Sequence, residues 1–328
     1  MKFFFLNCTL LFALHAFPQD CSKEILREKP GTWKAGMQGS IANVGSASLA
    51  KEKAVTAAIH KMIQASYFPK GCQLLYSTVY GKNPGTGQTF IGDPYYYSMY
   101  ILRFLCDPNS KDRSKFYVDI STTTTVNISA NAIFSLNSLY AANMPTDDSR
   151  GYLKLTKRPQ QKDGYWFMGE EVIGDRGTKS EIKEYRWLIT YNDTLPFSYL
   201  TRKEYLFLQK KRLEKDLVDN PGERDYTNTF IKNINDYLKR SAADLSQPAI
   251  CMWNEEQRFE KFVDEGTTGS FIAVQPNLAY YHKNIPPSAP QFFSVVFKMS
   301  AGDDVFTYNI EHIKKAIDFN ELKKMLGR

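Results

Sequence analysis

The chain has 328 residues and a formal net charge of +7, from 42 Lys and Arg against 35 Asp and Glu. This length is enough for one large domain or two small ones with a buried core. The basic residues are spread along the chain without a long block of like charge, so we expect no nucleic-acid partner. Aromatic residues make up 14% of the chain, which is typical of sheet-rich exported proteins.

The first residues have the pattern of a secretory signal peptide. Lys2 supplies a positive charge, and the apolar run 3–17 that follows is too short to span a bilayer comfortably. We therefore predict a signal peptide over 1–19, cleaved after Ala16 or after Gln19.

The remainder, 20–328, is predicted to be a single α+β domain. Cys21 also raises the alternative of a lipoprotein, but residues 17–20 are not the small residues that lipid attachment needs. No later segment is apolar enough to cross a membrane, so we predict a periplasmic or secreted protein without a transmembrane segment.

The region 46–192 is predicted to be rich in strands. It opens with a helix over 49–66, where apolar residues recur at helical spacing. Alternating apolar and polar residues then predict strands over 73–80, 99–106, 116–121, 152–156, 165–173 and 182–191. Turns at Asp163-Gly164 and at 174–177 are expected to join the last three strands into a meander.

The region 201–264 is predicted to be helical, with helices near 201–218, 226–243 and 254–264. Thr201 and Glu204 have the spacing of a capping box, so the first helix should begin at this point. Its Lys- and Arg-rich stretch 210–215 is interpreted as a solvated helix face, because acidic residues are interspersed.

The last region, 270–328, is predicted to be mixed. A strand over 270–274 precedes a hairpin of 292–299 with 305–309 and a C-terminal helix that begins near Asp318. We therefore expect an antiparallel β-meander sheet with an N-terminal helix and a later helical layer, closing with the hairpin and the C-terminal helix.

Four cysteines lie in the predicted domain: Cys21, Cys72, Cys106 and Cys251. A glycine-rich loop is predicted over 81–94. If the strands on either side of it pair about residue 89, Cys72 lies directly opposite Cys106. We therefore predict the disulfides Cys72–Cys106 and Cys21–Cys251, one of three possible connectivities. The alternative of four free buried thiols fits an exported protein less well, because that compartment is oxidising.

Motifs of the common catalytic centres are missing from the sequence. The domain contains three histidines, His60, His282 and His312. None has a second metal ligand at helical spacing, and there is no CxxC pair, so we predict no metal site. No nucleophile elbow or phosphate-binding loop occurs, and we predict no cofactor.

Two acidic pairs are the remaining catalytic candidates. Glu170 and Glu171 are neighbours on a strand, so their side chains should point to opposite faces of the sheet and not act on one bond. Asp303-Asp304 is better explained as part of a turn. We assign no catalytic residue.

Aromatic residues offer a more suggestive candidate site. Tyr95, Tyr96, Tyr97 and Tyr100 follow the glycine-rich loop, and exposed tyrosine rings provide a stacking surface with a polar edge for a sugar or a peptide. We predict that these residues bind the ligand. Trp166 and Trp187 are interpreted as core residues of a sheet face instead.

Two segments carry a resemblance. One contains Leu195-Pro196 and Leu200-Thr201-Arg202-Lys203-Glu204-Tyr205-Leu206, and the other is Pro287-Ser288-Ala289-Pro290-Gln291-Phe292-Phe293. They resemble segments of uncharacterised exported proteins of Bacteroidota-type bacteria. This resemblance implies a periplasmic or secreted setting and no particular activity.

Our first hypothesis is a non-catalytic exported binding or interaction protein of the cell envelope, with a glycan or a peptide as the small ligand, or with an envelope partner. The second is a hydrolase whose carboxylates are brought together by the fold, and the third is a structural envelope component. A carboxylate pair in one deep cleft would favour the hydrolase, and a shallow aromatic surface would favour binding.

Overall fold

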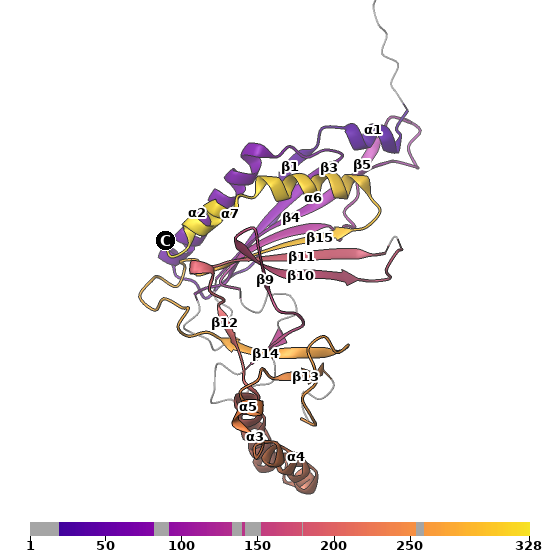
Figure 1. Ribbon diagram of the computed structural model, residues 1–328. Helices are drawn as coiled ribbons and strands as arrows, with labels where there is room; N and C mark the ends of the chain where they lie inside the picture. Colours follow the sequence, from indigo (N-terminus) through magenta and orange to yellow (C-terminus); the bar gives the residue numbers. More distant parts are fainter. Residues whose placement is uncertain (1–19, 82–91, 133–139, 142–151, 179, 254–258) are drawn as a thin grey trace, which may run out of the picture.

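The protein is described by a computed structural model that covers residues 20–81, 92–132, 140–141, 152–178, 180–253 and 259–328. The chain forms successive layers: helices, a ten-stranded sheet, a five-stranded sheet and further helices (Figure 1). This is the α+β fold with a large antiparallel sheet that the sequence predicts. The predicted signal peptide, 1–19, lies outside the described residues.

The ten-stranded sheet, here called the main sheet, combines strands from both ends of the chain. Its order is β1 (Thr32–Ala35), β3 (Cys72–Gly81), β4 (Tyr95–Cys106), β6 (Thr125–Ala130), β15 (Phe293–Ser300), β11 (Ile182–Ile189), β10 (Tyr165–Ile173) and β9 (Gln160–Lys162). Two short strands complete it, β2 (Ile41–Ala42) beside β3 and β5 (Phe116–Val118) beside β4. Among the described strands of this sheet, only β1 and β2 run parallel to their neighbour. Because β15 lies between β6 and β11, the end of the chain completes the sheet.

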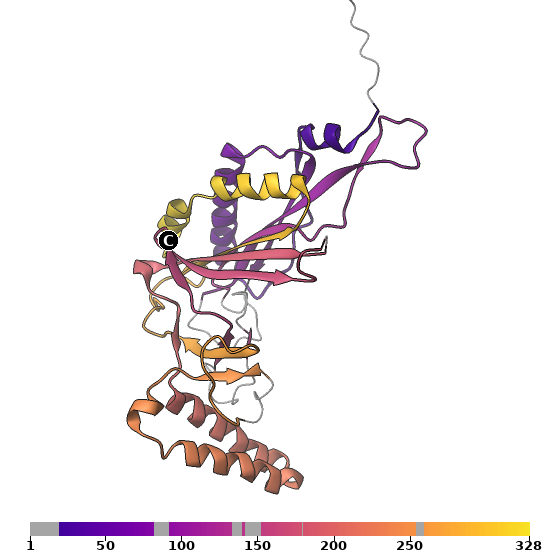
Figure 2. The same cartoon turned by 45° about the vertical axis from the view of Figure 1, so that its right-hand side comes forward.

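One face of the main sheet is covered by the helices α2 (Ser46–Ser66), α6 (Asp304–Ala316) and α7 (Phe319–Met325) (Figures 1 and 2). Ile59 and Ile63 are one helical turn apart on α2 and are fully buried against alternate strand residues such as Met99 and Ile128. Burial of each such side chain contributes about 1.5–3 kcal/mol, so this interface is the principal core.

The opposite face of the main sheet is partly covered by the second sheet. This sheet consists of β7 (Tyr140–Ala141), β8 (Leu153–Leu155), β12 (Phe197–Tyr199), β13 (Ile250–Met252) and β14 (Ser270–Pro276). Leu188 of the main sheet packs with Leu153 and Ile272 between the two sheets. Beyond the second sheet lie α3 (Arg202–Asp219), α4 (Arg224–Tyr237) and α5 (Ala242–Leu245) (Figure 2).

The predicted meander is present with a different first strand. β10 pairs with β11 as predicted, but its other neighbour is β9, while β8 pairs with β14 in the second sheet. All three residues of β9 are exposed, so this strand leaves no alternating pattern in the sequence. Leu153, Lys154 and Leu155 are all buried because β8 lies between two layers.

The predicted C-terminal hairpin is wrong. Its second strand, 305–309, is the first part of α6, and Asp303 caps this helix by accepting a hydrogen bond from the Val305 N–H (2.9 Å). Val305, Ile310 and Ile313 are buried on one side of this helix. This helical spacing becomes visible only over the whole of 304–316, whereas the alternation that predicted a strand covers 305–309 alone. The helix predicted near Asp318 is confirmed as α7.

Of the later helices, α3 is confirmed, and 226–243 is divided into α4 and the one-turn α5. The helix predicted over 254–264 is not formed in its described part, 259–264, which has no regular structure, and 254–258 lie outside the described residues. The aromatic residues Phe259 and Phe262 instead pack on Tyr237 and Tyr205 below the second sheet.

The predicted disulfide pairing is wrong. The disulfide joins Cys21 to Cys106, and Cys72 and Cys251 are buried and lie outside this bond. Cys72 lies opposite Arg103 rather than Cys106, because the register of β3 and β4 differs by three residues from the predicted one. The bond ties α1 (Lys23–Glu28) to the end of β4 and occupies the thiol that a lipid anchor would use. In the described part of the chain, no helix is long and apolar enough to span a membrane.

The capping box at the start of α3 is confirmed. Thr201 Oγ1 accepts from the Glu204 N–H (3.2 Å), and the Glu204 carboxylate accepts from the Thr201 N–H (2.8 Å). We expect Thr201→Ala to lower the free energy of unfolding by about 1 kcal/mol, measured by urea denaturation. Thr229→Ala, at an exposed position within α4, is the control and should change it by less than about 0.5 kcal/mol. Equal effects of the two substitutions would contradict a role for the cap.

Candidate functional site

Two of the four candidate tyrosines are core residues. Tyr95 and Tyr97 point from β4 toward the helical layer and are each only 1% exposed. The Tyr95 hydroxyl donates to the Ser288 carbonyl (3.2 Å), and the Tyr97 hydroxyl is bonded to Nδ1 of His60 (2.7 Å). The expectation that Tyr95 and Tyr97 present exposed rings after the glycine-rich loop is therefore wrong, because β4 begins at Tyr95 and buries alternate side chains.

Tyr96 and Tyr100 lie on the opposite face of β4, where both are half-buried. They are four residues apart on one strand and so share that face with the intervening Ser98. Trp187 packs against the core between the main sheet and its helices, and Trp166 packs against the core between the two sheets, as the sequence predicts for them.

The cross-strand pairing places Tyr100 in a row of side chains that crosses six strands. From β3 to β10 this row consists of Leu75, Tyr100, Thr125, Lys298, Glu184 and Glu171. A second row lies beside it and consists of Ser77, Ser98, Asn127, Val296 and Arg186. Residues directly opposite each other in a sheet share a face, so both rows lie on the face turned away from α2, α6 and α7.

The half-buried polar members of these rows form a surface that we call the polar face. It consists of Ser77, Ser98, Tyr100, Thr125, Asn127, Lys298 and Glu171. Among the described residues, no hydrogen bond or ion pair engages the side chains of Tyr100, Asn127 or Lys298. Antiparallel sheets commonly present one solvated face, but here a tyrosine ring, an amide and an ammonium group are held side by side with their bonding capacity unused.

A buried ion pair lies beside the polar face. Arg186 donates to Glu184 (2.7 Å) and to the hydroxyl of Ser294 (3.4 Å), and both charged side chains are less than 10% exposed. Because these partners hold the guanidinium and the carboxylate in place, the charges next to Lys298 and Glu171 have fixed positions.

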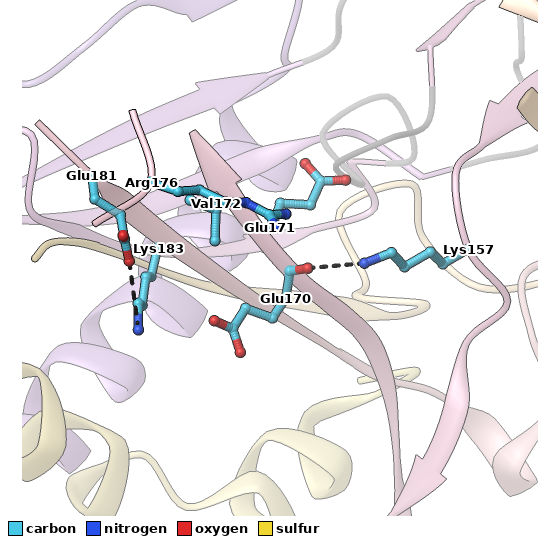
Figure 3. Close-up of a pocket in the computed structure, with 7 residues that line it drawn as sticks. All are labelled: Lys157, Glu170, Glu171, Val172, Arg176, Glu181 and Lys183. Atoms are coloured by element: carbon cyan, nitrogen blue, oxygen red, sulfur yellow. Dashed lines mark hydrogen bonds and ion pairs between the residues drawn. The ribbon is translucent and has the colours of Figure 1, made fainter. Parts of the chain in front are cut away.

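At its β10 end the polar face meets a pocket of about 620 Å³. The pocket is lined by Lys157, Glu170, Glu171, Val172, Arg176, Glu181 and Lys183 (Figure 3). Its volume is within the range of small-molecule sites, but its lining is almost entirely charged. Within the described residues, β9 pairs only with 165–167, so the rest of β10 is an edge strand. Charged side chains on an edge strand also keep it from pairing with strands of other chains, which is a second role for the charges of this pocket.

The two glutamates of β10 do not act together. Glu170 and Glu171 point in different directions (Figure 3), as the sequence predicts. Glu171 accepts from the Thr156 hydroxyl (3.2 Å), while Lys157 donates to the Glu170 carbonyl (3.2 Å). At the turn, the Gly177 N–H holds the pKa of Glu181 below its ordinary value. The fold does place Glu171 directly opposite Glu184, a carboxylate pair that the sequence does not reveal.

Several residues of this site carry no signal in the sequence. Thr125 ends a run of four threonines, and Asn127 and Lys298 are single polar residues between apolar ones. Only the pairing of β6 with β4 and β15 gathers these three residues around Tyr100. The alternation along 182–191 does place Glu184 and Arg186 on one strand face, opposite Tyr185 and Trp187.

Comparison of the chain with protein-family models, with curated proteins and with solved structures finds no match. Within the described ranges, no group of three or more His, Cys, Asp or Glu side chains is placed to hold a metal ion.

Proposed function

We propose that the protein is a non-catalytic binding protein of the cell envelope and that it binds a glycan on the polar face. The observation that supports this proposal is the set of unused hydrogen-bonding groups around the Tyr100 ring. A sugar presents an apolar ring face and several hydroxyls, which match a tyrosine ring flanked by the Asn127 amide and the hydroxyls of Ser98 and Thr125.

A peptide is the second ligand class for the same surface. It would use the Tyr100 ring for a side chain and the polar groups for its backbone amides. The glycan is favoured because the central part of the polar face consists of neutral polar groups, with Lys298 and Glu171 toward one end. A periplasmic or secreted setting is part of the proposal. It is supported by the Cys21–Cys106 disulfide, since such bonds persist in oxidising compartments.

A glycan array and a peptide array, probed with the domain 20–328, test the proposal. For a ligand found on either array, we expect Tyr100→Ala to weaken the affinity about tenfold, because removal of an interface anchor costs on the order of 1–2 kcal/mol. Isothermal titration calorimetry measures this change. Tyr117→Ala is the matched control, since Tyr117 is 45% exposed on β5, outside the polar face. Equal affinities of wild type and Tyr100→Ala would contradict the assignment.

Hydrolysis is the second candidate function, and the opposition of Glu171 and Glu184 favours it. Side chains directly opposite on antiparallel strands have Cβ atoms about 4.5–5.5 Å apart, within reach of the separation that retaining glycosidases use. Cleavage of a bound oligosaccharide that is abolished by Glu171→Gln would establish the hydrolase and overturn the non-catalytic proposal. Binding without turnover supports the first function.

A further inference from the structure

A second feature lies on the helical side of the main sheet, away from the polar face. Glu52, in the first half of α2, is fully buried against the ends of β3 and β4. Its Oε2 accepts from the Gly81 N–H (3.1 Å), but its Oε1 is buried without a hydrogen-bond partner. A buried carboxylate oxygen without a partner costs free energy, and such an atom usually indicates a missing proton, water or ion.

The surroundings of Glu52 contain a second carboxylate. Asp93, just before β4, is only 8% exposed, and its charge acts on Glu52. The other nearby side chains on these elements are hydroxyls: Thr56 and Tyr80 are bonded to each other (2.8 Å), and Tyr95 donates to Ser288. Within the described part of the chain, no lysine or arginine forms an ion pair with Glu52. Lys53 lies 5.9 Å from the Tyr80 ring.

We propose that Glu52 binds a proton in the folded protein at neutral pH. The proton on Oε1 removes a negative charge from a fully buried side chain whose carboxylate accepts one hydrogen bond, from the Gly81 N–H. It also removes the repulsion between this charge and that of Asp93.

Electrostatics agree with the geometry. Burial and then the charge of Asp93 raise the pKa of Glu52 from 4.5 to about 7, against a smaller opposite effect of the Gly81 N–H. The folded state therefore holds the proton more tightly than the unfolded state does. The resulting stability is complete below the unfolded pKa near 4.5 and is lost as the pH rises through about 7. Because the charge of Asp93 repels the ionised carboxylate, deprotonation opposes the packing of α2 against the start of β4.

Glu52→Gln tests the proposal, because glutamine keeps the acceptor for Gly81 and cannot ionise. We expect the folding equilibrium constant of the wild type, relative to that of Glu52→Gln, to fall about 200-fold between pH 4 and pH 8.5. Urea denaturation at a series of pH values measures this ratio. Glu214→Gln, at an exposed position of α3, is the control and should give a ratio to wild type that hardly changes with pH.

A second measurement does not depend on stability. The side-chain carboxyl carbon of Glu52, followed by NMR, should titrate near neutral pH, and Asp93→Asn should lower its midpoint. A Glu52 midpoint near 4.5, or parallel stability profiles of wild type and Glu52→Gln, would overturn the proposal. Stabilisation by calcium in wild type but not in Glu52→Gln would also overturn it, since the Glu52 carboxylate would then hold a cation in place of the proton.

Discussion

Replacement of Arg186 by methionine is expected to lower the free energy of unfolding by about 3–5 kcal/mol, because it leaves the Glu184 carboxylate buried without its cation. Glu184 is only 8% exposed, and its Oε1 accepts from Arg186 at 2.7 Å. Methionine fills much of the same volume, so the loss reports the uncompensated charge rather than a cavity. Urea denaturation followed by circular dichroism measures the change.

Two further variants separate the charge from general effects of substitution. Arg113→Met removes an arginine whose side chain is 82% exposed and should cost less than about 0.5 kcal/mol. The double variant Glu184→Gln/Arg186→Met removes both charges and should recover most of the lost stability, since a buried pair is often replaceable as a unit. If the double variant is no more stable than Arg186→Met, the loss of stability in Arg186→Met does not come from the uncompensated charge of Glu184.

Removal of the disulfide is the second change with a large expected effect. Cys21 and Cys106 are separated by 85 positions, and the chain-entropy treatment assigns about 4.5 kcal/mol to closing a loop of this size in the unfolded state. Cys21→Ser/Cys106→Ser should therefore unfold at a much lower urea concentration than wild type. Without the bond, the backbone N–H at position 21 still donates to the Arg113 carbonyl (2.8 Å).

Reducing agent provides the internal control for the disulfide. It should lower the stability of wild type and leave Cys21→Ser/Cys106→Ser unchanged. Cys72→Ala replaces a buried free thiol and should keep the sensitivity to reductant, because Cys72 takes no part in the bond. A Cys72→Ala variant that becomes insensitive to reductant would show that the pairing is different in solution.

Local features of the sequence predict local structure well in this chain. The Thr201–Glu204 capping box marks the start of α3, and the recurrence of Ile59 and Ile63 marks the buried side of α2. The alternation along β11 separates Tyr185 and Trp187 from Glu184 and Arg186. Each of these signals depends on residues a few positions apart, which short-range geometry connects directly.

Features that depend on distant segments could not be predicted. The register of β3 and β4 is not encoded by the residues of either strand alone, and the three-residue error placed Cys72 opposite the wrong partner. An odd shift of register reverses the face of every side chain. The polar face depends on β15 inserting between β6 and β11, so residues as distant as Asn127 and Lys298 become neighbours only in the folded sheet.

The central claim is that the polar face is the ligand-binding surface. It is tested most directly by NMR titration of isotope-labelled domain 20–328 with an oligosaccharide selected on the glycan array. We expect the largest shifts at Tyr100, Thr125 and Asn127, on adjacent strands of the main sheet. Shifts confined to α3 and α4, or to the helical side of the main sheet, would contradict the account.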